Sequence, residues 1–114
     1  MIYRANEAQS FEIPGGTSGR LYPPSEDGSH SVAYVKMDGV YPEKGYSLND
    51  RCSESIYLIS GQLTLTANGT ECVLRPGDLF VVTPGTKYSI KGRGEALDLI
   101  TPVWDKSQNH IIQN

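Results

Sequence analysis

The chain has 114 residues, 10 Lys and Arg against 13 Asp and Glu, and two cysteines. This length supports one domain with a modest core. The sparse, nearly balanced charge leaves no basic stripe for nucleic acid. No apolar run has the length of a signal peptide or a membrane span, and two cysteines cannot form a disulfide framework. We therefore expect a cytoplasmic protein with no nucleic-acid or membrane partner.

Short apolar or alternating segments, separated by Gly, Pro, Asn and Asp, predict an all-β chain because none of them keeps a helical period. Asn68-Gly69 predicts a type I′ hairpin in which Leu63 and Leu65 face Cys72 and Leu74 inside the barrel. The predicted strands are 19–22, 32–37, 46–48, 55–59, 62–66, 71–74, 79–82, 87–91 and 96–101.

Two glycine-rich segments, 16–29 and 91–95, are expected to be largely loop, since glycine and proline disfavour regular structure. The tail 102–114 is expected to form a final strand or a short helix, with Trp104 as an anchor. We predict one domain over 1–114. It has a core barrel at about 31–104, N-terminal strands and a loop at 1–30, and a tail at 105–114.

Two groups of residues carry a family resemblance. Residues 54–63 read ESIYLISGQL, and the turns Arg75-Pro76-Gly77-Asp78 and Thr83-Pro84-Gly85 follow. These segments resemble the two cupin motifs, G-x5-H-x-H-x3–4-E-x6-G and G-x5-P-x-G-x2-H-x3-N, over roughly 39–104. The resemblance implies a small double-stranded β-helix barrel, jelly-roll-like and of the RmlC type.

The histidine positions of these motifs hold other residues in this chain. With three residues before Glu54 the first motif places its histidines at Leu48 and Asp50, and with four it places them at Ser47 and Asn49; the second places its histidine at Tyr88. The resemblance therefore implies no histidine metal centre, and no cofactor is expected. A mixed oxygen site from Asp50, Glu54 and Tyr88 remains an alternative, whereas His30 and His110 lack the spacing of a ligand pair.

The cupin resemblance implies that Glu54 and Tyr88 point into the barrel, and alternation then sends Ile56 and Leu58 inward. We expect Glu54 and Tyr88 to be a catalytic acid/base pair. Together with Asp50, Arg51 and Tyr46 they form the expected ligand-binding set. The alternative is that Glu54 and Tyr88 form a purely structural polar pair.

Three functions stay open at this point. The first is binding of a small polar metabolite, a sugar or an organic acid, without metal. The second is an isomerase or epimerase using Glu54 and Tyr88, and the third is a metal-dependent oxygenase or isomerase with irregular ligands. Outward-facing Tyr57 and Ile59 would suit packing between two barrels, so we also predict a homodimer.

Overall fold

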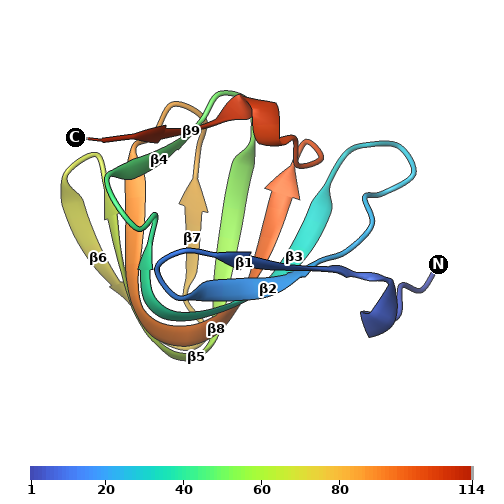
Figure 1. The fold of residues 1–114 in the computed structure, drawn as a ribbon, viewed down its shortest axis with the longest axis horizontal. Coiled ribbons are helices and arrows are strands. Elements are labelled where there is room, and N and C mark those ends of the chain that lie inside the picture. The colour runs from blue at the N-terminus through green and yellow to red at the C-terminus, as the bar shows by residue number, and fades with distance from the viewer. Residues whose placement is uncertain (114) are drawn as a thin grey trace.

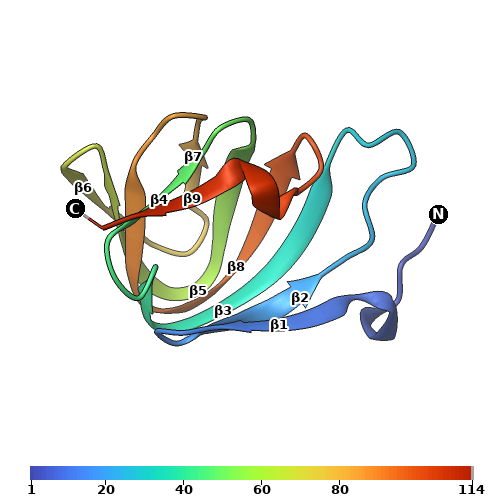
Figure 2. The ribbon, with the colours of Figure 1, turned by 45° about the horizontal axis from the view of Figure 1, so that its top comes forward.

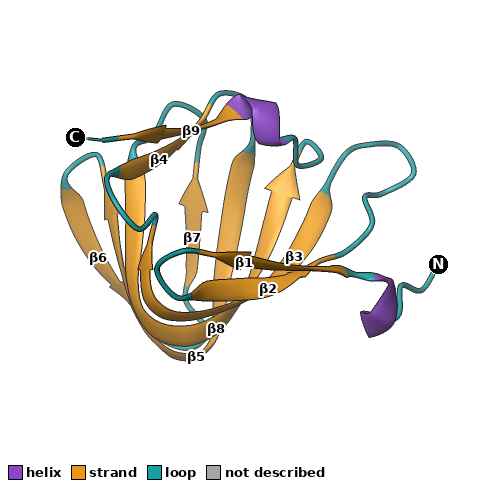
Figure 3. Ribbon diagram, viewed as in Figure 1, coloured by secondary structure: helices purple, strands orange, loops and turns teal. Residues whose placement is uncertain are grey.

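The computed structural model describes residues 1–113, whose backbone forms a single curled sheet (Figures 1 and 3). Two short 3-10 helices, η1 (Ala5–Glu7) and η2 (Lys106–Gln108), flank the strands. None of the helices in this range is long and apolar enough to cross a membrane. The strands are β1 (Gln9–Ile13), β2 (Thr17–Leu21), β3 (Ser31–Tyr41), β4 (Tyr46–Asn49), β5 (Ser53–Ala67), β6 (Thr70–Leu74), β7 (Leu79–Val82), β8 (Tyr88–Thr101) and β9 (Asn109–Ile112).

Two long strands, β5 and β8, organise the barrel. They pair antiparallel from Ser53↔Thr101 to Ala67↔Tyr88, and both curve through the bottom of the view in Figure 1. The neighbouring strands β1, β2, β3 and β8 form one wall of the barrel, and β6 and β7 each pair with β5. The pair formed by β4 and β9 crosses the opposite side (Figure 2). The all-β, jelly-roll-like barrel expected from the sequence is confirmed.

The tight curvature depends on glycines where the long strands bend. Gly39 pairs with Gly92, and Gly61 pairs with Gly94 beside a register shift between Leu58 and Ser60. A side chain on Gly61, Gly92 or Gly94 would overlap a backbone carbonyl of the neighbouring strand, and one on Gly39 would overlap the carbonyl of Gly15 in the turn between β1 and β2. These glycines therefore mark a bend inside continuous strands, as expected where two backbones approach closely.

Several predicted boundaries were wrong for this reason. Segment 91–95, expected to be a loop, lies within β8, and segments 55–59 and 62–66 are parts of the single strand β5. The first third of the predicted loop 16–29 is β2, and β1 was not predicted. The tail contains both expected elements, η2 followed by β9.

The core follows the alternation of β5. Ile56 and Leu58 are buried, whereas Tyr57 and Ile59 are exposed on the outer face. The hairpin register Leu63↔Leu74 and Leu65↔Cys72 is as predicted. Cys72 is exposed, however, so its expected place inside the barrel was wrong. The cluster comprises Met37, Ile56, Leu58, Leu63, Leu65, Leu74, Val82, Tyr88, Ile90 and Ala96.

A pair of glycine substitutions tests the bend. Gly61 and Gly77 both have positive φ, 84° and 93°, but only at Gly61 would a Cβ overlap a neighbouring carbonyl, that of Arg93. We expect Gly77→Ala to lower the free energy of unfolding by about 1 kcal/mol and Gly61→Ala by more than about 2 kcal/mol. Urea denaturation measures both, and equal losses would contradict the proposed crowding at the bend.

Candidate active site

Glu54 is the centre of a buried polar cluster inside the barrel. It lies near the start of β5 with 6% of its surface exposed, on the same inward face as Ile56. Its Oε2 accepts a hydrogen bond from the Tyr88 hydroxyl at 2.9 Å and another from Asn49 Nδ2 at 2.7 Å. Two donors to one carboxylate oxygen stabilise its negative charge. The structure thus brings together Glu54 and Tyr88, the two residues expected to form the acid/base pair.

Tyr88 is held as a neutral hydrogen-bond donor. Burial, followed by the nearby negative charge of Glu54, raises the pKa of Tyr88 well above its ordinary value of 10.0. Tyr41 lies beside it, with ring centroids 6.2 Å apart, and its hydroxyl is 3.2 Å from Ser47 Oγ. A phenol in these surroundings keeps its proton at neutral pH, so Tyr88 stabilises a charge or passes a proton rather than acting as a base.

Asn49 is oriented by the C-terminal segment. Its Oδ1 accepts hydrogen bonds from Gln108 Nε2 at 3.0 Å and Asn109 Nδ2 at 2.9 Å, so its own amide nitrogen points to Glu54. Gln108 Oε1 in turn accepts from the backbone N–H groups of Arg51 and Cys52. Asn49 and Gln108 are almost fully buried. The chain of bonds ties η2 and β9 to the carboxylate of β5.

The sequence left two alignments of the first motif open, one with Leu48 and Asp50 and one with Ser47 and Asn49 at the histidine positions. The orientation of β4 favours the second. Ser47 and Asn49 point inward and have no exposed surface, whereas Asp50 is exposed. Asp50 Oδ2 lies 2.7 Å from His110 Nε2 at the surface. The expectation that Asp50 lines the site was therefore wrong, because successive residues of a strand point to opposite faces. Asn49, one residue earlier, occupies that place.

Two further members of the expected ligand-binding set also lie away from Glu54. The Arg51 guanidinium pairs with Asp105 at 2.9 Å, and its side chain is 59% exposed. The Lys87 ammonium lies over the Tyr46 ring, 5.3 Å from the ring centre. Both residues line a surface pocket together with Asn68 and Gly69. Neither residue is placed to contact a ligand bound at Glu54.

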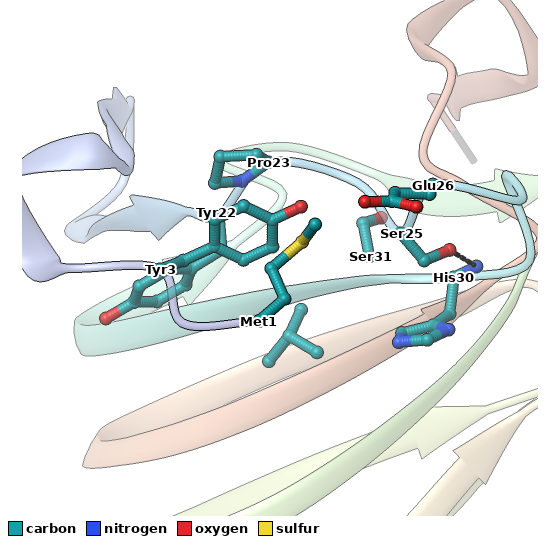
Figure 4. Close-up of a pocket in the computed structure, with 9 residues that line it drawn as sticks. Met1, Tyr3, Tyr22, Pro23, Ser25, Glu26, His30 and Ser31 are labelled. Carbon is teal, nitrogen blue, oxygen red and sulfur yellow. Dashed lines mark hydrogen bonds between the residues drawn. The ribbon is translucent and has the colours of Figure 1, made fainter.

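His30 lies at a separate surface pocket of about 410 Å³ (Figure 4). Its Nδ1 is 3.0 Å from Ser29 Oγ. The figure shows Met1 and the two tyrosine rings at one side of this pocket and the histidine at the other. It is lined by Met1, Tyr3, Tyr22, Pro23, Ser25, Glu26, His30, Ser31 and Val32.

Asp98 is the site residue that the sequence interpretation missed. On β8 it pairs with Ile56 of β5 and Ala33 of β3, both buried, so it faces the barrel interior. The signal was present, because alternation through Ala96, Asp98 and Ile100 puts one acidic residue on an otherwise apolar inward face. Its Oδ1 is shielded from solvent.

The Asp98 carboxyl is held in its protonated form. Burial, then the negative charge of Glu54 and a hydrogen bond with it, raises the pKa of Asp98 well above its ordinary value of 3.8. Asp98 as a whole residue is half-buried. Its carboxyl group is nevertheless surrounded by protein atoms, and these surroundings set its pKa. Two carboxyl groups that share one site cannot both ionise easily, so the pair carries one proton, and Asp98 holds it.

The residues at the cupin ligand positions do not fit a divalent metal ion. They are Ser47, Asn49, Glu54 and Tyr88, of which one carries a carboxylate. Asn49 and Tyr88 already donate to Glu54, and Ser47 Oγ accepts from Asn109. A divalent ion in such a barrel prefers imidazole or several carboxylates. Within residues 1–113, no three His, Cys, Asp or Glu side chains converge on one point.

Comparison with known proteins gives a consistent fold. The family model described as "Cupin domain" matches residues 42–101, more than half of the chain. No curated protein matches significantly.

Three solved structures are similar throughout. The Streptomyces nucleoside dehydratase Pac13 is 21% identical, with 99% of this chain and 91% of that chain covered and a TM-score of 0.88; variants of it were solved with uridine. KdgF from Halomonas is 19% identical (94% and 97% covered, TM-score 0.76), and so is an RmlC-like cupin from Shewanella frigidimarina (92% and 93%, 0.75). At these identities the likeness shows the fold alone.

The raised pKa of Asp98 predicts a specific dependence of stability on pH. Below pH about 4, Asp98 is protonated in both the folded and the unfolded chain; above it, only the unfolded chain loses this proton. We expect this residue to lower the free energy of unfolding by about 1.4 kcal/mol per pH unit until the pH passes the folded pKa. The difference between wild type and Asp98→Asn in urea denaturation, measured from pH 4 to 9, isolates this slope from other groups. A constant difference would show that Asp98 is ionised in the folded protein.

Proposed function

This chain belongs to the cupin family, and we propose that its barrel holds a small polar metabolite against Glu54 and Tyr88 without a histidine-bound metal or any other cofactor. The observation that carries the proposal is the Glu54 carboxylate, buried inside the barrel and oriented by Tyr88 and Asn49. Burying a charged group is costly, so a protein retains one chiefly where it has a task. The barrel interior is also where such folds hold ligands.

A second candidate, an acid–base enzyme, is supported by Asp98. Burial and the neighbouring Glu54 raise the pKa of Asp98, and a carboxyl group held protonated beside a second carboxyl group is suited to donate a proton. Glu54 would accept a proton from the ligand and Asp98 would donate one. The direct bond between Glu54 and Tyr88 puts both on the same side of a ligand, so an epimerase with these two on opposite faces of one carbon is less well supported. Pac13, a nucleoside dehydratase, is an example of an enzyme with a similar barrel.

We further propose that the chain forms a homodimer through the outer face of its sheet. Two cross-strand rows lie there, Leu79-Tyr57-Leu97 and Val81-Ser55-Leu99. The large apolar residues of this outer apolar face are 41–60% exposed. A contiguous apolar patch of this kind is typical of an interaction surface, and the sheet gives it a flat shape suited to a second copy.

Glu54→Gln tests the binding proposal. The variant keeps the shape of the side chain but removes its charge, so the charge-assisted bonds at Oε2 become ordinary ones. For any metabolite found by a thermal-shift screen, we expect affinity to fall at least about tenfold, or 1.4 kcal/mol. Calorimetric titration measures the loss. Glu71→Gln is the matched control, because that carboxylate is 63% exposed on β6. Unchanged affinity in Glu54→Gln would assign Glu54 a structural role.

Leu97→Lys tests the dimer. Leu97 belongs to the outer apolar face and pairs with Tyr57; in a dimer interface a buried lysine there would lose its hydration without gaining a partner. We expect light scattering at micromolar concentration to give the dimer mass for the parent and the monomer mass for the variant. Val73→Lys on β6 is the control, since Val73 is equally exposed (42%) but pairs with Thr64, outside that face. A monomeric parent would refute the proposal.

A further inference from the structure

The outer face of the sheet has a recess beside the ends of β2 and β3. It is the surface pocket of about 410 Å³ drawn in Figure 4. Tyr22 and Val32 line it from the sheet, where the Tyr22 N–H donates to the Val32 carbonyl at 3.0 Å. Met1 and Tyr3 line it from the N-terminal segment, and Figure 4 shows Met1 on the same side as both tyrosine rings. This side of the recess is therefore apolar and aromatic.

The recess is continuous with the outer apolar face. Val32 pairs with Leu99 of β8, which in turn pairs with Ser55 of β5. Ser55 pairs with Val81 of β7. Residues that pair directly across strands point to the same face. One cross-strand row therefore runs over the outer face, from the recess at its β3 end to Val81 at its β7 end.

The two ends of this face have opposite shapes. At the β7 end, Leu79 and Val81 are 60% and 50% exposed, more than the three large apolar residues in the middle of the face, at 41–45%. At the β3 end, Val32 is half-buried beside the recess. A twofold dimer sets residue i of one copy against residue j of the other, and j against i. A face that projects at one end and is recessed at the other can therefore be complementary to itself.

We propose that the recess is the docking site for a second copy of this chain, and that Val81 of each copy enters the recess lined by Tyr22 and Val32 of the other. This inference rests on the proposed homodimer, since it specifies how the two copies meet. The twofold axis then runs along the strands near β8, the middle strand of the path β2-β3-β8-β5-β7. Each dimer contains the contact twice, and both contacts remove apolar surface from water.

Packing favours this arrangement over the other twofold arrangement of the same two faces. An axis across the strands would set β7 of one copy on β7 of the other, and recess on recess. The projecting side chains would then meet at one end while a gap remained at the other. Stable interfaces match the packing density of protein interiors. The proposed arrangement fills each recess with a projecting side chain, and it also covers Met1, which is otherwise 85% exposed.

Cross-linking of introduced cysteines tests the inference. The full chain carries Cys72→Ser, which removes the exposed cysteine, while Cys52 is buried. Tyr22→Cys and Val81→Cys are made singly and together, and a short bismaleimide joins nearby thiols. Within one chain the two positions are four strand spacings apart, about 19 Å, which is beyond the reach of the linker. A link between them therefore joins two copies, and mass spectrometry of the cleaved product identifies it.

A variant that fills the recess tests the same contact without cysteines. Val32→Trp places a large side chain where Val81 of the other copy would enter, so we expect the dimer dissociation constant to rise at least tenfold in analytical ultracentrifugation. Val73→Trp on β6 is the matched control, because Val73 is 42% exposed and lies outside the outer apolar face. Melting curves show whether a loss arises from unfolding. If Val32→Trp does not fold, the cross-links alone decide.

The outcomes separate this inference from the proposed homodimer. We expect the double variant to form a covalent dimer linked between positions 22 and 81, while each single variant stays unlinked. If Val81→Cys alone is linked as fully as the double variant, or if folded Val32→Trp dimerises like the parent, the docking site is refuted while the homodimer stands. If light scattering and ultracentrifugation give only the monomer mass for the parent, both proposals are refuted.

Discussion

The hydrogen bonds to Glu54 Oε2 are the constraint on which the interior of this barrel depends. A carboxylate with 6% exposure is tolerated only if its charge is compensated, and here a phenol and an amide supply the compensation. The phenol is contributed by β8 and the amide by β4, so the charge draws together strands that lie more than thirty residues apart in sequence. The polar cluster thereby contributes to the closure of the sheet as well as to the site.

The tail of the chain belongs to this arrangement. A free asparagine amide could turn either end toward Glu54, but the oxygen of Asn49 is already taken by Gln108 and Asn109. The nitrogen is then the only end left for the carboxylate. Gln108 also accepts from two backbone N–H groups in the turn before β5, which holds the start of that strand in place. Because of these bonds, η2 and β9 determine which end of the Asn49 amide faces Glu54, although neither element contains a charged site residue.

The sequence predicted the fold well because its strongest signals are local. Asn68-Gly69 and Pro84-Gly85 indicate turns. The alternation from Glu54 to Leu58 predicts which side chains are buried. Gly92 and Gly94 were expected in a loop for the same reason, because two glycines close in sequence are typical of loops. Their pairing with β5 shows instead that they permit a bend within a strand. The pairing of the three strands at that bend, β3, β5 and β8, is long-range, and a single sequence does not display it.

The candidate site was predictable only in part, for a related reason. Glu54 and Tyr88 could be found because each stands at a motif position, and the structure joins them. The expected ligand-binding set contained Asp50, whereas the structure places Asn49 beside Glu54. The orientation of β4, which puts Asn49 inside and Asp50 at the surface, depends on its pairing with β9. Asp98 lies outside both motifs, and its place near Glu54 follows from the β5–β8 register, which pairs Asp98 with Ile56 and Glu54 with Ile100.

The pair of carboxyl groups gives the barrel a different character from that of a metal-binding cupin. Imidazoles around a divalent ion present a positive centre that attracts anionic ligands. Here the equivalent place holds the Glu54 carboxyl group beside the protonated Asp98. The loss of histidines at Ser47, Asn49 and Tyr88 therefore changes the sign of the charge at the site.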